Sequence, residues 1–338
     1  MGVGKLGALA LAAIVSAGQV TAQDTINLKF AVFTPEQEIT YQTAMKPWAE
    51  AVEAATDGKV KIEMFPGGIL GRDGSKQVKM LKDGVADIAF IIPAYNPGLF
   101  PDNWIIELPD TSANATEGSM TFVRMLESGQ LRGYEDLQPL GFVASSPYLM
   151  HGTKPIESID DIKGQKIRIA GKLEQTCVEE VGGVPVGMPI SKIPESLTRG
   201  IIDATPMHFA ALYAFGVSSA VDHHYLNQFG SLPFGFVMTK ERFAELPEDV
   251  QAAMKENGGE TLAKAFGAAM DEENAKRLEE TKAKGGQTVV VPSDADKAAW
   301  SDAMKACSAK FVAEQENGEA LQKAYLDTLT QVRAELGK

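Results

Sequence analysis

The residue with the clearest capacity for chemistry is Arg168, in the segment 164–171 (GQKIRIAG). Ile167 and Ile169 alternate with more polar neighbours, which is the period-2 pattern of a short strand, and glycines bound the segment on both sides. If the isoleucines face the core, Arg168 faces away from it, near the carboxyl end of the strand, where open α/β sheets bind ligands. A guanidinium can hold a carboxylate through two parallel hydrogen bonds. On its own, the segment favours an arginine at a solvated strand end, so the case for a ligand contact depends on the rest of the chain.

Further candidate ligand contacts lie at the ends of other predicted strands. A first strand over residues 26–32 is followed by Phe33, and a buried strand over residues 86–92 is followed by Tyr95 and Asn96. Each position alone fits a core or turn residue, but together they describe a mostly apolar cavity with one cationic anchor, as in many small-molecule sites. The predicted ligand-binding residues are Arg168, Phe33, Arg72, Tyr95, Asn96, Tyr148, Met188, Met207 and Phe209.

The sequence lacks the motifs of several other chemistries. Residues 182–187 (GGVPVG) do not have the glycine spacing of a dinucleotide-binding loop, and no G-x-S-x-G nucleophile elbow occurs. The histidines are scattered except for His223 and His224. Adjacent residues of a strand point to opposite faces, so this pair would chelate one metal ion poorly. We therefore expect no metal site, no cofactor and no catalytic residues.

Length and charge narrow the class of protein. A chain of 338 residues is too long for one compact core and favours two lobes. The formal net charge of -13 argues against nucleic acid or an anionic membrane surface as a partner. An acidic protein can still bind an anion where a local basic group defines the pocket, and this is the role expected for Arg168.

The first residues predict an export signal over residues 1–22. Lys5 supplies a positive charge, residues 6–15 form an apolar run too short to span a membrane, and residues 20–22 (VTA) are typical of a cleavage site. No cysteine near that point offers a lipid anchor. We expect the mature protein to be free in an oxidising compartment, most simply a bacterial periplasm.

Cys177 and Cys307 are the two cysteines of the chain. Export permits a disulfide between them, but their spacing cannot show whether their Cα atoms come within about 7 Å of each other. A bridge and two buried free thiols both remain open, and we favour the thiols. Neither cysteine has a histidine nearby in sequence, so a nucleophilic thiol is not indicated.

Strand and helix patterns predict α/β lobes. Strands at residues 26–32, 60–64 and 86–92 alternate with helical segments, the βαβ signature of a parallel sheet. An internal echo suggests two lobes of like construction, because residues 81–87 (LKDGVAD) and 197–203 (LTRGIID) share leucine, glycine and aspartate at the same spacing. Each copy is typical of a helix that ends on a glycine cap and leads directly into a strand.

The order of the elements predicts that the two lobes are interleaved, with several crossovers. We expect lobe I to comprise residues 23–147 plus 234–280, and lobe II residues 148–233 plus 281–327, with residues 328–338 as a C-terminal tail. A long amphipathic stretch covers residues 248–282 and is interrupted at Gly258 and Gly259.

At four places in the same order, the chain resembles the periplasmic solute-binding proteins of tripartite ATP-independent periplasmic (TRAP) transporters. These places are residues 161–168 (DIKGQKIR), 185–189 (PVGMP), 197–203 (LTRGIID) and 236–240 (FVMTK). The resemblance covers nearly the whole mature chain. It implies a two-lobed, type II-like periplasmic-binding-protein fold, with crossing strands and a long connecting helix between the lobes, that closes on its solute. The amphipathic stretch over residues 248–282 agrees with that helix. The resemblance also implies that the arginine at the position of Arg168 forms a salt bridge with the ligand's carboxylate.

The resemblance also implies partners and limits the ligand. Proteins of this family pass their solute to a small and a large membrane subunit, which move it with an ion gradient. Members similar to this chain often continue after the Asp203 strand as Met-Pro-Trp-Glu, whereas this chain has Met207, His208, Phe209 and Ala210. A second arginine near Tyr148, as in sialic-acid-type members, is missing. A sialic acid is therefore not the expected ligand.

The sequence thus predicts a receptor for a small organic carboxylate, without catalysis and monomeric, that serves a TRAP transporter. Phe209 and the shortage of hydroxyl-rich strand ends favour a small or aromatic monocarboxylate over a sugar acid. Two alternatives stay open. One is the binding protein of an ATP-driven transporter with a similar two-lobed fold, and the other is a periplasmic enzyme acting on a small acid.

Overall fold

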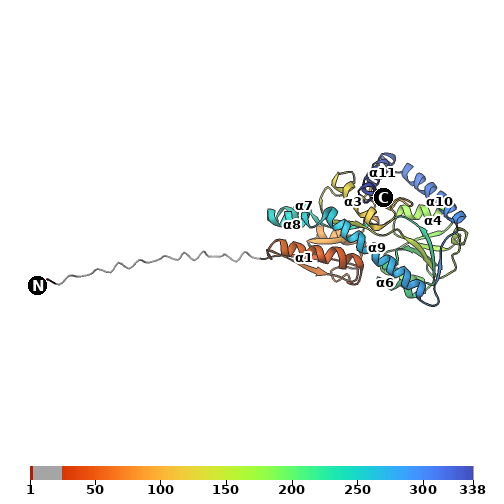
Figure 1. Ribbon diagram of the computed structural model, residues 1–338, viewed down its shortest axis with the longest axis horizontal. Helices are drawn as coiled ribbons and strands as arrows, with labels where there is room; N and C mark the ends of the chain where they lie inside the picture. The colour runs from red at the N-terminus through yellow and green to blue at the C-terminus, as the bar shows by residue number, and fades with distance from the viewer. Residues whose placement is uncertain (3–24, 338) are drawn as a thin grey trace.

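The computed structural model describes residues 1–2 and 25–337 and contains two β-sheets, each covered by helices (Figure 1). We call the sheet that contains the first strand, with its helices, lobe I, and the other lobe II. The lobe I sheet has the order β2-β1-β3-β10-β4. Its strands are β1 (Ile26–Ala31), β2 (Val60–Phe65), β3 (Ile88–Ile91), β4 (Leu137–Ala144) and β10 (Pro233–Thr239).

The lobe II sheet has the order β11-β9-β5-β8-β6-β7. In both sheets a parallel core is extended by antiparallel strands: β10 runs antiparallel to β3 and β4 in lobe I, and β5 runs antiparallel to β8 and β9 in lobe II. The lobe II strands are β5 (Leu149–Gly152), β6 (Lys166–Ile169), β7 (Val184–Gly187), β8 (Ala204–Met207), β9 (His223–Gln228) and β11 (Thr288–Val290).

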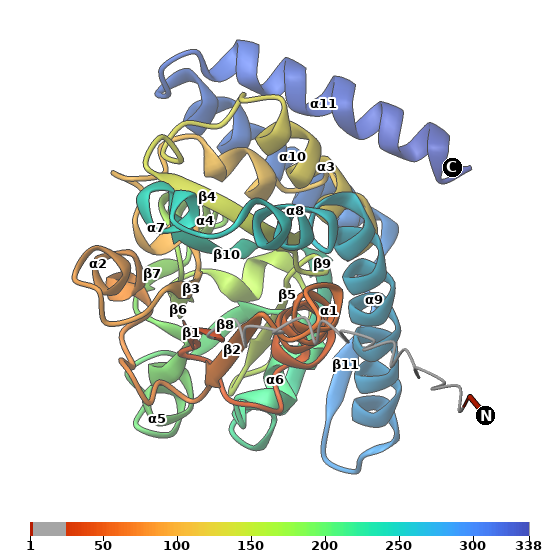
Figure 2. The same cartoon turned by 90° about the vertical axis from the view of Figure 1, so that its left-hand side faces the viewer.

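The helices surround both sheets, as Figure 2 shows. Most are short, and the longest is α9, which contacts α3 and β4 of lobe I as well as α6 and β11 of lobe II. The helices are α1 (Lys46–Ala55), α2 (Gln77–Lys82), α3 (Ala115–Glu127), α4 (Lys172–Glu180), α5 (Ile193–Thr198), α6 (Phe209–Ala214), α7 (Lys240–Ala244), α8 (Glu248–Glu256), α9 (Gly259–Ala283), α10 (Asp294–Ala313) and α11 (Gly318–Glu335).

Two chain segments cross between the sheets side by side. One joins β4 to β5 and the other joins β9 to β10. They are hydrogen-bonded to each other, because the Ser145 amide donates to the Leu232 carbonyl at 3.0 Å and the Tyr148 amide donates to the Gly230 carbonyl at 3.1 Å. The long helix α9 lies along both lobes as a third connection. The predicted interleaving and the long connecting helix are both present, whereas the exact residue boundaries of the lobes stay a prediction.

The internal echo corresponds to a repeated structural unit. Gly84 and Gly200 both have left-handed backbone angles, with φ of 69° and 65°, and end α2 and α5. After each glycine, an aspartate accepts a hydrogen bond from a lysine amide on the neighbouring strand at 2.8 Å. Asp87 accepts from Lys29 on β1, and Asp203 accepts from Lys166 on β6. The same short sequence therefore fixes the start of a central strand in each lobe, and in lobe II that neighbouring strand carries Arg168.

The two cysteines form a disulfide, with their Cα atoms 5.0 Å apart. Our preference for two free thiols is therefore wrong. Cys177 lies on α4 and Cys307 on α10, and these helices pack against each other although 130 residues separate the cysteines in sequence. Spacing along the chain could not reveal this contact.

The C-terminal residues continue as helix. Helix α11 runs to Glu335 and packs against α3 of lobe I, so most of the segment 328–338 that we expected as a tail is helical. Of the predicted signal peptide, residues 3–22 lie outside the described part of the chain. Within the described residues, no helix combines the length and the apolar character needed to cross a membrane.

Candidate functional site

Arg168 is a buried arginine on β6, between β8 and β7, with only 1% of its surface exposed. Its Nε donates to the Met188 carbonyl at 3.1 Å, and its Nη2 donates to the Tyr95 hydroxyl at 3.4 Å. Neither acceptor is charged, and no ion pair joins Arg168 to a carboxylate within residues 25–337. A buried cation is costly unless it is paired. The site therefore holds a positive charge that an anion from outside the chain can neutralise.

Tyr95 connects the two lobes at this point. It ends the short helix Pro93–Tyr95 that follows β3 of lobe I. Besides accepting from Arg168, its hydroxyl accepts a hydrogen bond from the Ile190 amide of lobe II at 3.3 Å. Both contacts join lobe I to lobe II, so the described conformation is one in which the lobes meet around Arg168.

The Phe33 ring lies beside Tyr95 on the lobe I side. Phe33 stacks on Phe90 with ring centroids 5.3 Å apart, and it lies 6.4 Å from the Tyr95 ring at a tilt of 46°. Phe33 packs against the main hydrophobic cluster and also against the smaller cluster of lobe II, to which Met188 is adjacent. Four of the predicted site residues, Phe33, Tyr95, Met188 and Arg168, are therefore brought together at the junction of the lobes.

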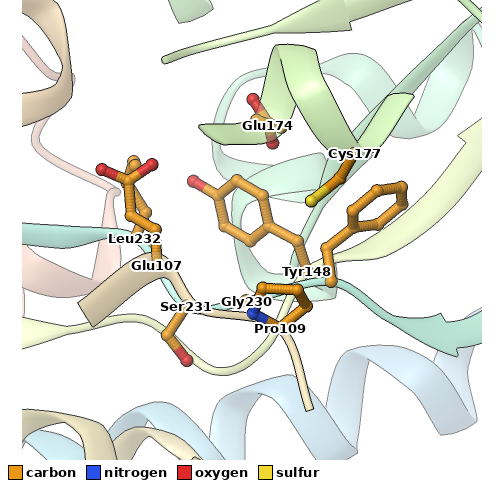
Figure 3. A pocket seen from close by; sticks show the side chains of 9 residues that line it. Glu107, Pro109, Tyr148, Glu174, Cys177, Gly230, Ser231 and Leu232 are labelled. Atoms are coloured by element: carbon orange, nitrogen blue, oxygen red, sulfur yellow. The ribbon is translucent and has the colours of Figure 1, made fainter. Parts of the chain in front are cut away.

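Tyr148 lies in the first crossing segment, near enough to Arg168 that the guanidinium charge opposes part of the rise that burial causes in the pKa of Tyr148. With Glu107, Glu174 and Ser231 it lines a small cavity of about 20 Å³. Figure 3 shows the Tyr148 ring between Cys177 and Glu107. The Tyr148 hydroxyl lies on the side of the ring where the Glu107 and Glu174 carboxyl groups are. The cavity is large enough for one water molecule and offers it several polar partners.

Burial shifts the proton affinities of these groups. The pKa of Glu107 is raised to about 8, first by burial and then by the negative charge of Glu174. Burial also raises the pKa of Glu174, although nearby Arg168 and the Ala170 amide oppose the shift. The pKa of Tyr148 is raised well above its ordinary value by burial. Glu107 is therefore mostly uncharged at neutral pH and competes little for the positive charge of Arg168.

Met207 and Phe209 lie in the lobe II core. Both side chains belong to the smaller hydrophobic cluster and are almost completely buried. Phe209 meets the His151 ring edge-on at 4.9 Å, and the Met207 carbonyl faces His151 Nε2 at 3.0 Å. Between them, His208 turns the other way, toward Tyr148, with ring centroids 5.8 Å apart. Burial lowers the pKa of His208 to about 3, so this ring is neutral at physiological pH.

For Asn96 and Arg72, the two remaining predicted site residues, the structure shows no side-chain contact with Arg168. Asn96 follows Tyr95 and is half-buried, and its backbone closes the turn after the short helix. Arg72 is exposed, on a loop that reaches the site two residues later at Gly74. A Cβ atom on Gly74 would lie 2.9 Å from the Tyr95 ring and 3.1 Å from Phe33. The loop therefore packs closely against these two rings at a position where a larger side chain would collide with them.

Sequence reasoning missed Glu107, Glu174 and the contact at Ile190. Most carboxylates of this chain lie in mixed Glu/Asp/Lys segments, which are usually solvated helix faces, so composition does not single out these two. Glu174 had a detectable local signal, because it is the third residue of α4 and reaches back to the Ala170 amide like a capping residue. Nothing in the sequence near Glu107 indicates that α4 would bury it.

Two α/β lobes joined by paired crossing segments, with an unpaired buried arginine between them, define the class of two-lobed solute-binding proteins. The match of residues 30–315 to the family model described as bacterial extracellular solute-binding protein, family 7, shows that this chain belongs to that family. The family consists of solute-binding receptors of TRAP transporters, not enzymes, and its members work in the periplasm. The family and the fold predicted from sequence are thereby confirmed.

Known relatives cover most of the chain. It is 27% identical over 307 residues to the C4-dicarboxylate-binding protein DctB of Bacillus subtilis, covering 82% of this chain and 80% of that protein. Among solved structures, one similar protein is a TRAP solute-binding protein from an unidentified marine microbe, specific for aromatic acids and crystallised with 3-hydroxybenzoate. Its TM-score is 0.85 at 25% identity, and the match covers 91% of this chain and 99% of the other. A TRAP solute-binding protein of Rhodoferax ferrireducens with copurified benzoate has a TM-score of 0.87, covering 93% and 100% at 23% identity, and shows the same fold.

Proposed function

We propose that this protein binds a small organic carboxylate between its lobes and delivers it to a TRAP transporter, without catalysing a reaction. The observation that carries the proposal is the buried guanidinium of Arg168, which has neutral hydrogen-bond partners within the described chain. A carboxylate ligand would supply the missing negative charge through charge-assisted hydrogen bonds. The Tyr95 hydroxyl occupies part of that position and would shift or share the guanidinium when the ligand binds.

The residues around Arg168 favour an aromatic or other small monocarboxylate. Phe33 and Tyr95 offer ring faces on the lobe I side, with the buried Phe90 stacked against Phe33, and Met188 offers a flexible apolar side chain on the lobe II side. Arg168 is the one buried arginine at this junction among the described residues. A single buried cation suits one carboxylate better than two. The aromatic acids bound by the marine relative agree with this ligand class.

Binding would be coupled to closure of the lobes. Tyr95 and Ile190 approach each other from opposite lobes at Arg168, so a ligand there touches both lobes only when they are together. A ligand shifts a conformational equilibrium by its difference in affinity for the two states. We infer that the closed receptor, acting as a monomer in the periplasm after removal of residues 1–22, presents both lobes to a small and a large membrane subunit.

The experiment is a thermal-shift screen of the mature protein against small acids, neutral sugars and amino acids, followed by calorimetry on Arg168→Ala. A ligand at 100 times its dissociation constant stabilises the folded state by about 2.7 kcal/mol. Removing the charged partner of a buried carboxylate costs about 2–5 kcal/mol, which is roughly 30-fold to several thousand-fold in affinity.

The matched control is Arg199→Ala, which removes an exposed arginine of the same lobe that pairs with Glu195 at 2.9 Å. It should leave affinity unchanged. Hits confined to neutral solutes, or an Arg168→Ala affinity within threefold of the wild type, would refute the proposed role. Detection of turnover of a bound acid would instead favour the enzyme alternative.

A further inference from the structure

His208 carries a hydrogen-bond donor that the proposed function leaves unused. It directly follows β8, which pairs in parallel with β6, the strand that carries Arg168. The carboxyl ends of parallel strands lie at the same edge of a sheet, and open α/β sheets bind ligands at that edge. Met207 and Phe209 enter the lobe II core, whereas the His208 ring lies beside Tyr148, with 5.8 Å between ring centroids. His208 is therefore turned toward the segment that crosses between the lobes.

The proton of the His208 ring has a fixed position. The Ala211 amide donates a hydrogen bond to His208 Nδ1 at 3.2 Å, so Nδ1 carries a lone pair and not a proton. Burial lowers the pKa of His208 to about 3, so the ring is neutral at physiological pH. A neutral imidazole has one N–H, and with Nδ1 acting as acceptor this N–H is at Nε2. His208 therefore presents one neutral donor in one direction.

This donor is unpaired but not enclosed. Within residues 25–337, the bond from the Ala211 amide is the single hydrogen bond of the His208 side chain, so its Nε2–H has no acceptor there. The atoms in this part of the chain that lack a partner and are also shut off from solvent are Thr34 Oγ1, Gln77 Oε1, Asn103 Nδ2, Trp104 Nε1, Gln165 Oε1 and His223 Nδ1. His208 Nε2 is not among them, so it keeps accessible surface although His208 is only 4% exposed. A ligand atom can therefore reach this N–H.

The surroundings indicate which ligand atom suits the donor. The charged carboxylate of a ligand is held best by the guanidinium of Arg168, because both partners of that hydrogen bond are ionised. A second carboxylate is disfavoured beside Tyr148, because Glu107 and Glu174 line the same small cavity as Tyr148 and like charges repel. The acceptor that suits His208 is therefore an uncharged oxygen, in a hydroxyl or a carbonyl group.

We propose that His208 determines ligand specificity by donating its Nε2–H to a hydroxyl or carbonyl oxygen of the acid whose carboxylate binds Arg168. The ligand is then a hydroxy or oxo monocarboxylate and not an unsubstituted acid. This inference rests on the proposed function, because it assigns the second polar contact of the same ligand. A site that buries such a donor rejects an analogue without the oxygen, because the N–H is then left unpaired.

The test is calorimetry on the mature protein with four probes: benzoate and its 2-, 3- and 4-hydroxy derivatives. The three isomers place the hydroxyl at different distances from the carboxylate. At least one of them should bind about five- to tenfold more tightly than benzoate, which is the worth of one neutral hydrogen bond. The readout is the ratio of the two affinities, because a general loss of stability weakens both acids alike and leaves the ratio unchanged.

Two substitutions separate the donor of His208 from its acceptor. His208→Asn keeps an acceptor at the position of Nδ1 for the Ala211 amide, as asparagine does at the start of many helices, but has no atom at the position of Nε2. His208→Gln can place an amide N–H at the position of Nε2 but no acceptor at Nδ1. We expect the asparagine variant to lose the preference for the hydroxy acid and the glutamine variant to retain most of it. His223→Asn is the matched control, because His223 pairs with Gly152 at the other end of the sheet, and it should leave the ratio unchanged.

The position of the proton can be measured without any ligand. Long-range ¹H–¹⁵N correlation NMR distinguishes the two ring nitrogens, and the signals of His208 are those that disappear in His208→Asn. We expect a neutral ring with its proton on Nε2 between pH 5 and pH 8. A proton on Nδ1, or a charged ring in this range, refutes the inference. This measurement decides if the glutamine variant fails to fold.

The outcomes separate this inference from the proposed function. Equal affinities for all four acids that are all lost with Arg168→Ala support the receptor and refute the role of His208. A hydroxy-acid preference that His208→Gln loses and His208→Asn keeps also refutes it, because the effect then follows the helix start. If none of the four acids binds, this ligand class is wrong, while the wider screen still tests the receptor. A preference that follows the donor while Arg168→Ala leaves both affinities unchanged supports His208 and refutes the proposed function.

Discussion

The disulfide between Cys177 and Cys307 should stabilise the protein strongly without acting on ligand binding. The bond closes a loop of 130 residues between α4 and α10. The loop-entropy relation gives about 5 kcal/mol at 25 °C for a loop of this length, because the cross-link restricts the unfolded chain. Both cysteines are almost fully buried, so reductant will reach them only when the protein unfolds.

The measurement compares oxidised and reduced wild-type protein by equilibrium unfolding in guanidinium chloride. The reduced form is prepared by unfolding in reductant and refolding under it, so that both forms have the same sequence. With a dependence of about 6 kcal/mol per molar guanidinium, a loss of 5 kcal/mol lowers the midpoint by roughly 0.8 M. The double variant Cys177→Ser plus Cys307→Ser should follow the reduced protein, and it excludes incomplete reduction.

Affinity for the identified acid provides the second readout. Arg168 is held by β6 and by its bonds to Met188 and Tyr95, not by the disulfide, so reduced and oxidised protein should bind the acid within twofold of each other. Equal midpoints in the two forms would refute the loop-entropy reasoning. A large change in affinity with little change in stability would show that the bond is a redox switch of the site and not a structural cross-link.

Two further substitutions test the site. Tyr95→Phe keeps the ring but removes the hydroxyl that accepts hydrogen bonds from Arg168 at 3.4 Å and from the Ile190 amide at 3.3 Å, so affinity for the identified acid should fall about five- to tenfold by calorimetry. The control is Tyr213→Phe, because the Tyr213 hydroxyl lies 3.0 Å from Thr281. Equal effects of the two substitutions on affinity would contradict the role of Tyr95. Because burial raises the pKa of Glu107 from 4.5 to about 8, the folded protein retains a proton that the unfolded chain releases, and this group removes stability as pH rises between those values. The Tm of Glu107→Gln should therefore rise relative to that of the wild type by a few degrees between pH 5 and pH 8, and the difference should be constant above pH 8. Parallel Tm curves of the two proteins between pH 5 and pH 8 would show that the Glu107 carboxyl ionises normally.

The sequence contained local signals that were sufficient for much of the fold. Alternating isoleucines around Arg168 located β6, and the leucine, glycine and aspartate shared by two segments located the repeated unit that ends at Asp87 and Asp203. These features depend on neighbours a few residues apart, because strand periodicity and glycine caps are local properties. They also sufficed to place Phe33 and Tyr95 after strands that reach the junction of the lobes.

The direction of individual side chains was harder to predict. Met207, His208 and Phe209 follow one strand in succession, yet Met207 and Phe209 enter the lobe II core while His208 faces Tyr148. Alternation predicts that neighbours point to opposite sides, but it does not say which side is the core. That choice depends on the packing of helices whose positions are set elsewhere in the chain.

What the sequence by itself determined is the kind of element at each position and the arginine able to hold a carboxylate. The tertiary structure alone decided which distant groups meet that arginine: Tyr95 lies 73 residues away from it in sequence. The packing of α4 on α10 joined Cys177 to Cys307, and packing at the lobe junction buried Glu107 beside Glu174. Burial and proximity between remote segments set hydrogen bonds, charge states and cross-links, and they arise only when the two lobes assemble into one packed molecule.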